Sequence, residues 1–157
     1  MPQRLIDIPI ESLPFVDEHS TTIAATQEAV WEALLDVTGA ISSGPGSSRL
    51  ARALGCVPIE RRGEAGQIGS TVPGFVVTRA VRPAVLALMG EHRFSRYALI
   101  FTTTEVPAGA VRLSAETRAE FPGRSGGAYR ALVIGTRGHV LATNSILRAV
   151  RHRAERR

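Results

Sequence analysis

The stretch from residue 57 to residue 121 constrains the fold most strongly, because it contains six consecutive strand-like segments. Glycine and proline signals separate these segments, which are VPIERR, GQIGSTV, FVVTRAVR, AVLALMGEH, FSRYALIFTTTEV and AVRLSAETRAEF. The last one alternates most cleanly, and one of its faces carries Val111, Leu113, Ala115, Thr117, Ala119 and Phe121. Such alternation predicts antiparallel strands with one buried face, and VPAGAV before the last segment predicts a hairpin.

The residues before this region predict one more strand and two helices. FVDEHSTTI (15–23) has the loose alternation and the β-branched residues of a strand. TQEAVWEALLDV (26–37) has helical periodicity, with Thr26 as its N-cap and Trp31 flanking its apolar face. After a loop at GAISSGPGSS, the segment SRLARALG predicts a short helix that ends at Gly55.

The first fourteen residues are expected to behave differently. Pro9 and Pro14 oppose regular structure, so residues 1–14 predict an extended arm. Prolines and acids interrupt the apolar core that a signal peptide would need. Cys56 is the one cysteine of the chain and has no partner for an internal disulfide. Both observations favour a reducing, cytoplasmic location.

The closing segment, YRALVIGTRGHVLATNSILRAVRHRAERR, is the most apolar long stretch of the sequence. At 100° per residue its apolar side chains form one stripe, which predicts a long helix over about 125–154 with Ser125 as its N-cap. Arg137, His139 and Arg148 interrupt the apolar residues, so no run reaches the ~18 residues of a membrane span. We expect the helix to pack on the sheet through Tyr129, Leu132, Thr136, Val140, Thr143, Leu147 and Val150.

The net charge of +5 is concentrated at the C-terminus. Residues 148–157 hold five arginines against Glu155, a sum of +4, and the rest of the chain has 14 arginines against 13 acids, a sum of +1. We therefore expect no nucleic-acid partner, and expect the arginines after Val150 to contribute mainly solubility and a helix-dipole interaction. The sequence contains no lysine, which excludes Schiff-base catalysis on a lysine.

Three patterns point to specific chemistry, and each has a simpler interpretation. GRSGG (123–127) matches a nucleophile motif, but no acid followed by a histidine lies downstream, so we interpret it as a turn and helix start. SGPGSS lacks the strand–helix unit of a dinucleotide site. The side chains that could bind a metal are not spaced as metal ligands usually are, so we expect neither a metal nor a cofactor. These side chains are His19, His92, His139, His152 and Cys56.

The segment GEHRFSRYALIF holds the densest group of polar and aromatic side chains. Read as one strand, it puts Glu91, Arg93, Ser95 and Tyr97 on one side and His92, Phe94, Arg96 and Ala98 on the other. Facing a cavity, these groups would supply a general acid or base. Facing outward, they would form a ladder of arginine and glutamate with Tyr97 partly packed. The sequence leaves both orientations open.

The order of a strand, two helices, a run of antiparallel strands and a C-terminal helix resembles the START-like, helix-grip superfamily, also called SRPBCC or Bet v 1-like. The resemblance covers residues 16–154 and rests on IAATQEAVWEALLDV, VPGFVVTRAVRP, GEHRFSRYALIF, AETRAEFPG and YRALVIGTRGHVL. The strand-to-helix entry with VWEALLD is typical of bacterial polyketide-cyclase-like and lipid-transport-like members. The resemblance implies an α+β domain over 15–157, in which a curved sheet wraps a long C-terminal helix.

The same resemblance implies a cavity between sheet and helix that binds or transports a hydrophobic or amphipathic small molecule. The expected lining residues are Ala115, Thr117, Ala119, Tyr129, Leu132, Thr136, Val140 and Thr143. One alternative is an enzyme of the polyketide cyclase or dehydratase kind, with His139 or Tyr97 as proton shuttle. A second alternative is a protein-interaction module whose cavity has collapsed.

Overall fold

The structure is a computed structural model and describes residues 2–40, 49, 52–135 and 137–157. Its strands are β1 (Phe15–Ile23), β2 (Thr71–Val72), β3 (Phe75–Val81), β4 (Val85–His92), β5 (Ser95–Val106) and β6 (Ala110–Glu120). Its main helices are α2 (Gln27–Ala40), α4 (Gly123–Gly135) and α5 (Gly138–Ala154). Among the described residues there are also the shorter elements α1 (Pro2–Ile6), η1 (Ile10–Ser12) and η2 (Pro107–Gly109), and the predicted short helix SRLARALG lies partly outside the described residues.

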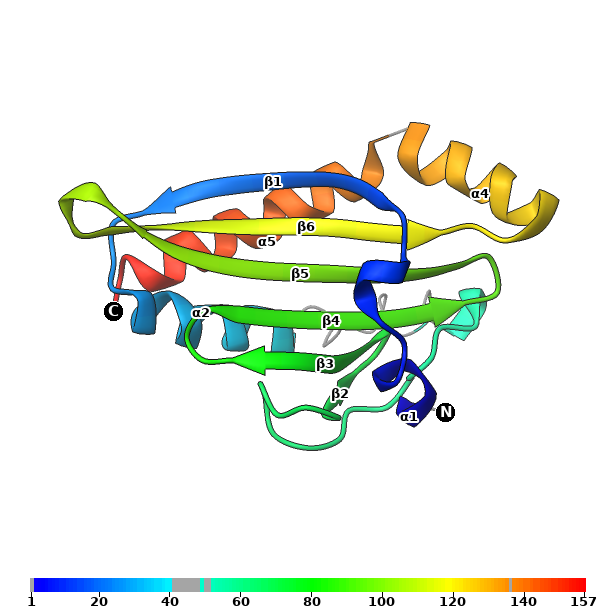
Figure 1. Ribbon diagram of the computed structural model, residues 1–157, viewed down its shortest axis with the longest axis horizontal. Coiled ribbons are helices and arrows are strands. Elements are labelled where there is room, and N and C mark those ends of the chain that lie inside the picture. Colours follow the sequence, from blue (N-terminus) through cyan, green and yellow to red (C-terminus); the bar gives the residue numbers. More distant parts are fainter. Residues whose placement is uncertain (1, 41–48, 50–51, 136) are drawn as a thin grey trace.

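The strands form one antiparallel sheet in the order β1-β6-β5-β4-β3-β2 (Figure 1). The long strands match the predicted segments closely, and η2 lies in the predicted hairpin between β5 and β6. The segment VPIERR is an exception, because only isolated bridges form there, at Val57 and Arg62. The alternation of β6 is confirmed: Val111, Leu113 and Ala115 are buried on the face that we call the inner face.

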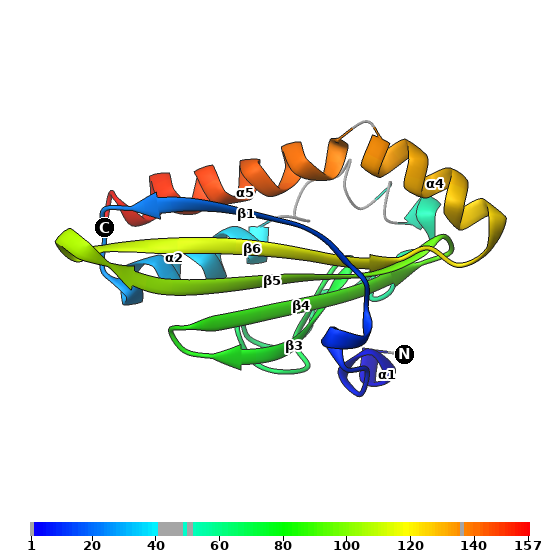
Figure 2. The same ribbon diagram turned by 45° about the horizontal axis from the view of Figure 1, so that its top comes forward.

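Helices α2 and α5 cover the inner face of the sheet (Figures 1 and 2). The predicted N-cap of α2 is confirmed, since Thr26 Oγ1 accepts a hydrogen bond of 3.2 Å from the Ala29 amide. Trp31 is 2% exposed and belongs to the core, as expected. In α5 the buried side chains follow a spacing of four, three and four residues, which is one face of a helix; they are Thr143, Leu147, Val150 and Ala154.

The predicted long C-terminal helix over about 125–154 is wrong in one respect, because two helices replace it. Arg137 has a left-handed backbone (φ 57°) and separates α4 from α5. The local sequence GTRG explains the break, since two glycines and a threonine have low helix propensity. Figure 2 shows α4 inclined to α5 and lying near the end of β6. Helix α4 begins at Gly123, so Ser125 lies inside its first turn and is not the N-cap.

The predicted extended arm over 1–14 is also corrected, because it contains α1 and η1. Pro9 precedes η1 and Pro14 follows it, so the prolines limit this short helix without preventing it. The segment packs on the outer face of the sheet, in front of the strands in Figure 1. Its buried side chains and the strand residues beneath them form a second core of Leu5, Ile10, Leu13, Val76, Ala87, Met89 and Ala98.

The last residues of the chain are more than a solubilising tail. Ala154 is 2% exposed and belongs to the main core. Arg153 and Arg157 both form ion pairs with Asp36 of α2. The Glu155 carboxylate accepts a hydrogen bond from the backbone amide that follows β1. The end of α5 is therefore attached both to α2 and to the first strand.

Candidate functional site

A cavity of about 450 Å³ lies between the inner face of the sheet and the C-terminal helices. Strands β3 to β6, helices α4 and α5, and the segment before Val57 contribute to its walls. It is lined by Leu54, Cys56, Phe75, His92, Ser95, Tyr97, Ala98, Leu99, Thr117, Ala119, Phe121, Tyr129, His139, Ala142, Thr143 and Ile146. Its size lies within the usual range of small-molecule sites.

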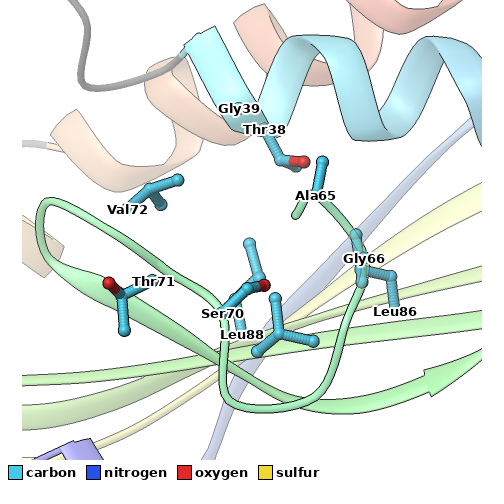
Figure 3. Close-up of a pocket in the computed structure, with 10 residues that line it drawn as sticks. Thr38, Gly39, Ala65, Gly66, Ser70, Thr71, Val72, Leu86 and Leu88 are labelled. Carbon is cyan, nitrogen blue, oxygen red and sulfur yellow. The ribbon is translucent and has the colours of Figure 1, made fainter. Parts of the chain in front are cut away.

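A second hollow lies between the end of α2 and the segment before β2. Figure 3 shows Thr38 and Gly39 opposite Ala65 and Gly66. Its volume is about 30 Å³, which is room for one or two water molecules. Two larger hollows, of about 380 and 450 Å³, lie over the outer face of β1, β6 and β5 and beside the β5–β6 hairpin. Of these four hollows in the described part of the chain, the cavity against α4 and α5 combines apolar walls with several polar side chains.

One end of this cavity is built from aromatic rings. The His92 ring lies 4.7 Å from Tyr129 and 5.5 Å from Tyr97, measured between ring centroids. Phe94 stacks on Tyr129 at 5.4 Å, and Phe75 meets Tyr97 edge to face at 5.3 Å. Edge-to-face and stacked pairs at these distances are favourable. We call these five rings the aromatic end; four of them line the cavity, and Phe94 supports Tyr129 by stacking on it.

A two-residue hairpin places these groups, and it corrects the single strand assumed for residues 91–97. Strands β4 and β5 turn at Arg93 and Phe94, so His92 pairs with Ser95 on the inner face. The outer face receives the expected ladder: Arg96 lies 3.6 Å from Glu91 and 2.6 Å from Glu120. Both orientations considered from the sequence therefore occur, on opposite faces of the hairpin.

Tyr97 is held by close backbone packing. Its hydroxyl donates a hydrogen bond of 2.9 Å to the Gly74 carbonyl. Its ring covers Gly90 on β4, where a Cβ atom would approach the ring within 2.7 Å and the Gly74 carbonyl within 2.0 Å. Burial, reinforced by Cys56 and Tyr129, raises the pKa of Tyr97 far above its ordinary value. The hydroxyl is therefore a poor proton donor at neutral pH.

A polar cluster beside the cavity joins β1, β6 and α5, and two of its members, Thr117 and His139, line the cavity. His139 Nε2 lies 2.6 Å from Asp17 Oδ2, and His19 Nε2 lies 3.2 Å from the same oxygen. Thr117 stands opposite Asp17 in the β1–β6 register. The side chains of His139 and Asp17 are 14% and 23% exposed. We call Asp17, His19, Thr117 and His139 the polar cluster.

The environment of the polar cluster favours an ionised Asp17. Burial alone would raise the pKa of this carboxyl, but hydrogen bonds from His139 and His19 outweigh it and lower the pKa. The Thr117 hydroxyl is near enough to add to this effect, yet it does not reach hydrogen-bond geometry. Among the described residues, Asp17 Oδ1 and Thr117 Oγ1 therefore remain buried without a hydrogen-bond partner.

The structure places only part of the expected lining residues at the cavity. Thr117, Ala119, Tyr129 and Thr143 line it, together with His139 and Tyr97. Ala115 is fully buried in the core below it, and half-buried Val140 does not line it. Thr136 and the side chain of Leu132 lie outside the described residues.

The sequence did not place Cys56 or His92 in the expected cavity lining, and it gave no role to Asp17, which contacts the cavity residue His139. Alternation along β1 could have indicated that Asp17 points to the inner face, because it lies on the same face as His19, Thr21 and Ile23. The region around Cys56 forms no regular strand, so no periodicity marked it. Among the residues that the structure describes, no group of three or more His, Cys, Asp or Glu side chains is arranged to hold a metal ion.

The sequence matches no family model, and no curated protein matches it significantly. Solved structures do resemble it. Truncated norcoclaurine synthase from Thalictrum flavum has a TM-score of 0.52 at 11% identity, over 87% of this chain and 94% of that one. A START superfamily protein from Mycobacterium smegmatis has a TM-score of 0.47 at 15% identity, over 90% and 98%. CalU16 from Micromonospora echinospora has a TM-score of 0.48 at 15% identity, over 88% of this chain and 82% of that one.

The likeness to norcoclaurine synthase concerns the fold. The protein has an α+β helix-grip fold, in which a curved antiparallel sheet packs around the C-terminal helix. In the described part of the chain, no helix is long and apolar enough to cross a membrane.

Proposed function

We propose that this protein binds an apolar or amphipathic small molecule, lipid-like or polyketide-like, in the cavity between the sheet and helices α4 and α5. The observation that carries the proposal is the cavity itself: about 450 Å³, with mostly carbon walls and a few converging polar groups. Ligand sites commonly combine these features. The same volume favours this proposal over the alternative of an interaction module with a collapsed cavity.

A neutral fluorescent probe such as N-phenyl-1-naphthylamine tests this proposal. We expect saturable binding with a micromolar Kd, about −8 kcal/mol. Ala142 is exposed and yet lines the cavity, so Ala142→Trp should obstruct it without disturbing the core. We expect at least about ten-fold weaker binding.

Ala149→Trp is the matched control, because Ala149 is exposed on the same helix and does not line the cavity. Its probe affinity should equal that of the wild type. Equal binding by both tryptophan variants would place the probe elsewhere and refute the proposal.

One observation favours a second candidate function, proton transfer in an enzyme of the cyclase or dehydratase kind. His139 lines the cavity and contacts the Asp17 carboxylate at 2.6 Å. If the imidazole removed a proton from a bound ligand, the neighbouring carboxylate would stabilise the resulting imidazolium. Tyr97 suits this role less well, because its hydroxyl is bound to Gly74 and its pKa is raised.

Deuterium exchange at the central carbon of an aromatic 1,3-diketone tests this second function by NMR. The wild type should accelerate exchange above the buffer rate, and His139→Gln should lose the acceleration while keeping probe affinity within a few fold. His152→Gln, which changes an exposed histidine of the same helix, is the control. Exchange at the buffer rate with wild-type protein would exclude proton abstraction from this substrate class.

A further inference from the structure

The aromatic end contains three polar rings, and two of them already use their hydrogen-bonding atoms within the protein. The Tyr97 hydroxyl donates a hydrogen bond of 2.9 Å to the Gly74 carbonyl. The His92 ring accepts a backbone amide hydrogen at Nδ1, and its Nε2 lies 3.2 Å from Ser95 Oγ. The third ring belongs to Tyr129, whose hydroxyl makes no hydrogen bond with any residue that the structure describes.

The Tyr129 hydroxyl can be reached from the cavity. Tyr129 lines the cavity, and its oxygen is not among the buried atoms that lack a partner, whereas that of Thr117 is. Burial and then the nearby Cys56 raise the pKa of Tyr129, and Tyr129 adds to the effect of burial on the pKa of Tyr97. Since Cys56 and Tyr97 both line the cavity, the Tyr129 hydroxyl lies on the cavity side of its ring, and it stays protonated at neutral pH.

The ring that carries this hydroxyl is held from two sides. Phe94 stacks on it at 5.4 Å with an angle of 21° between the planes, and His92 meets it edge to face at 4.7 Å. Close packing also fixes the helix itself, because a Cβ atom at Gly126 of α4 would approach the Phe94 carbonyl oxygen within 3.1 Å. A ring held in this way loses little conformational freedom when a ligand binds, so its hydroxyl is a preorganised donor.

Helix α5 brings two more polar side chains to the cavity, and neither lies among the rings. His139 Nε2 is 2.6 Å from Asp17 Oδ2, so this nitrogen is engaged with a carboxylate. Thr143 is 5% exposed and follows His139 by about one helical turn. Tyr129 therefore places its donor where the aromatic part of a ligand would pack against other rings.

We propose that Tyr129 is the specificity-determining residue of the cavity, and that its hydroxyl donates a hydrogen bond to the carbonyl oxygen of an aromatic ligand. A carbonyl oxygen only accepts hydrogen bonds, so it matches a donor that has no partner in the described protein. The inference rests on the proposed ligand-binding function and narrows its ligand class to aromatic carbonyl compounds, such as aryl ketones. A hydrocarbon of the same shape would leave this hydrogen bond unmade.

Benzophenone and 1,1-diphenylethylene test the proposal, because they share one skeleton and differ in the replacement of a carbonyl oxygen by a methylene group. Displacement of N-phenyl-1-naphthylamine gives both affinities, and their ratio is the measurement. Tyr129→Phe removes the donor and keeps the ring, so it should lower the ratio of ketone to alkene affinity about five-fold or more. Its alkene affinity should stay within about two-fold of the wild type. The carbonyl stretching frequency of bound benzophenone should rise in the same variant, because the hydrogen bond is lost.

Thr143→Val is the matched comparison, because it removes another hydroxyl from the cavity wall, outside the aromatic end. It should keep the wild-type ratio within about two-fold. If Tyr129→Phe keeps the wild-type ratio, or if Thr143→Val lowers it as much, the inference is overturned while ligand binding stands. If the naphthylamine probe itself does not bind, the proposed function and the inference fall together.

Discussion

His139 on α5 lies 2.6 Å from Asp17 on β1, measured between Nε2 and Oδ2. Strand β1 is an edge of the sheet, so this contact joins the helix layer to an edge strand at the wall of the cavity. The two residues are 122 positions apart in the chain. A change in this pair therefore affects stability as well as the cavity.

Asp17→Asn should lower the free energy of unfolding at neutral pH by about 1–3 kcal/mol, because His139 and His19 lose a charged acceptor. The folded-state pKa of Asp17 is depressed, so its stabilisation is present above the unfolded-state value of about 4 and is lost as the pH falls through the folded-state value. Urea titrations from neutral pH to about pH 2 should show the difference between variant and wild type shrinking.

Asp7→Asn is the control for this titration, because Asp7 is exposed. It should unfold with wild-type stability at every pH. A destabilisation by Asp17→Asn that stayed constant down to the lowest pH would show that the charge of Asp17 does not stabilise the fold.

Gly90→Ala should destabilise the protein by about 1–3 kcal/mol through overpacking. A methyl group at Gly90 meets the Gly74 carbonyl and the Tyr97 ring, and neither has room to withdraw without losing the hydrogen bond between them. Near-ultraviolet circular dichroism should report the displaced tyrosine, and urea unfolding the loss of stability. Gly127→Ala in α4 meets no atom within 4 Å and should leave both signals unchanged or add slight stability.

Leu13→Ala tests the packing of the N-terminal segment on the outer face. Leu13 is 2% exposed, so the truncation should cost about 2–5 kcal/mol in the free energy of unfolding. Ile68→Ala, at a side chain that is 59% exposed, should cost no more than about 0.5 kcal/mol. Equal stability of the two variants would mean that the N-terminal segment does not contribute to the core in solution.

Asp36→Asn removes the acceptor of both Arg153 and Arg157. We expect a loss of about 0.5–1 kcal/mol that becomes smaller at high salt, because the pairs are partly exposed. Thermal unfolding at low and at high salt measures this. Glu60→Gln breaks a pair with Arg62 whose side chains are 70% and 76% exposed, and it should have no measurable effect.

Local patterns predicted the elements whose periodicity continues over many residues. The alternation of β6 and the β-branched residues of β1 gave strands close to those observed, and the Thr26 cap placed the start of α2. The break at Arg137 was missed because the apolar stripe stays nearly in phase from Tyr129 to Val150. Periodicity indicates which face of a helix is apolar, and the short connection that contains Arg137 changes the phase of that face little.

The site itself was harder to predict, for two physical reasons. The hairpin at Arg93 and Phe94 carries none of the glycine or asparagine signals of a two-residue turn, so the inward position of His92 had no local mark. The contact between Asp17 and His139 depends on how α5 crosses the sheet, which is a tertiary property. Such pairs emerge only when the fold is assembled.

The break at Arg137 also has a consequence for how the two helices tolerate change. Helix α5 anchors the fold through Leu147, Val150 and Ala154, whereas Tyr129 belongs to α4, on the other side of the break. Because the two helices are joined through a non-helical residue, insertions or replacements in α4 can reshape the aromatic end without shifting the register of α5. A change in α4 would therefore alter the surroundings of Tyr129 while the packing of α5 on the sheet is kept.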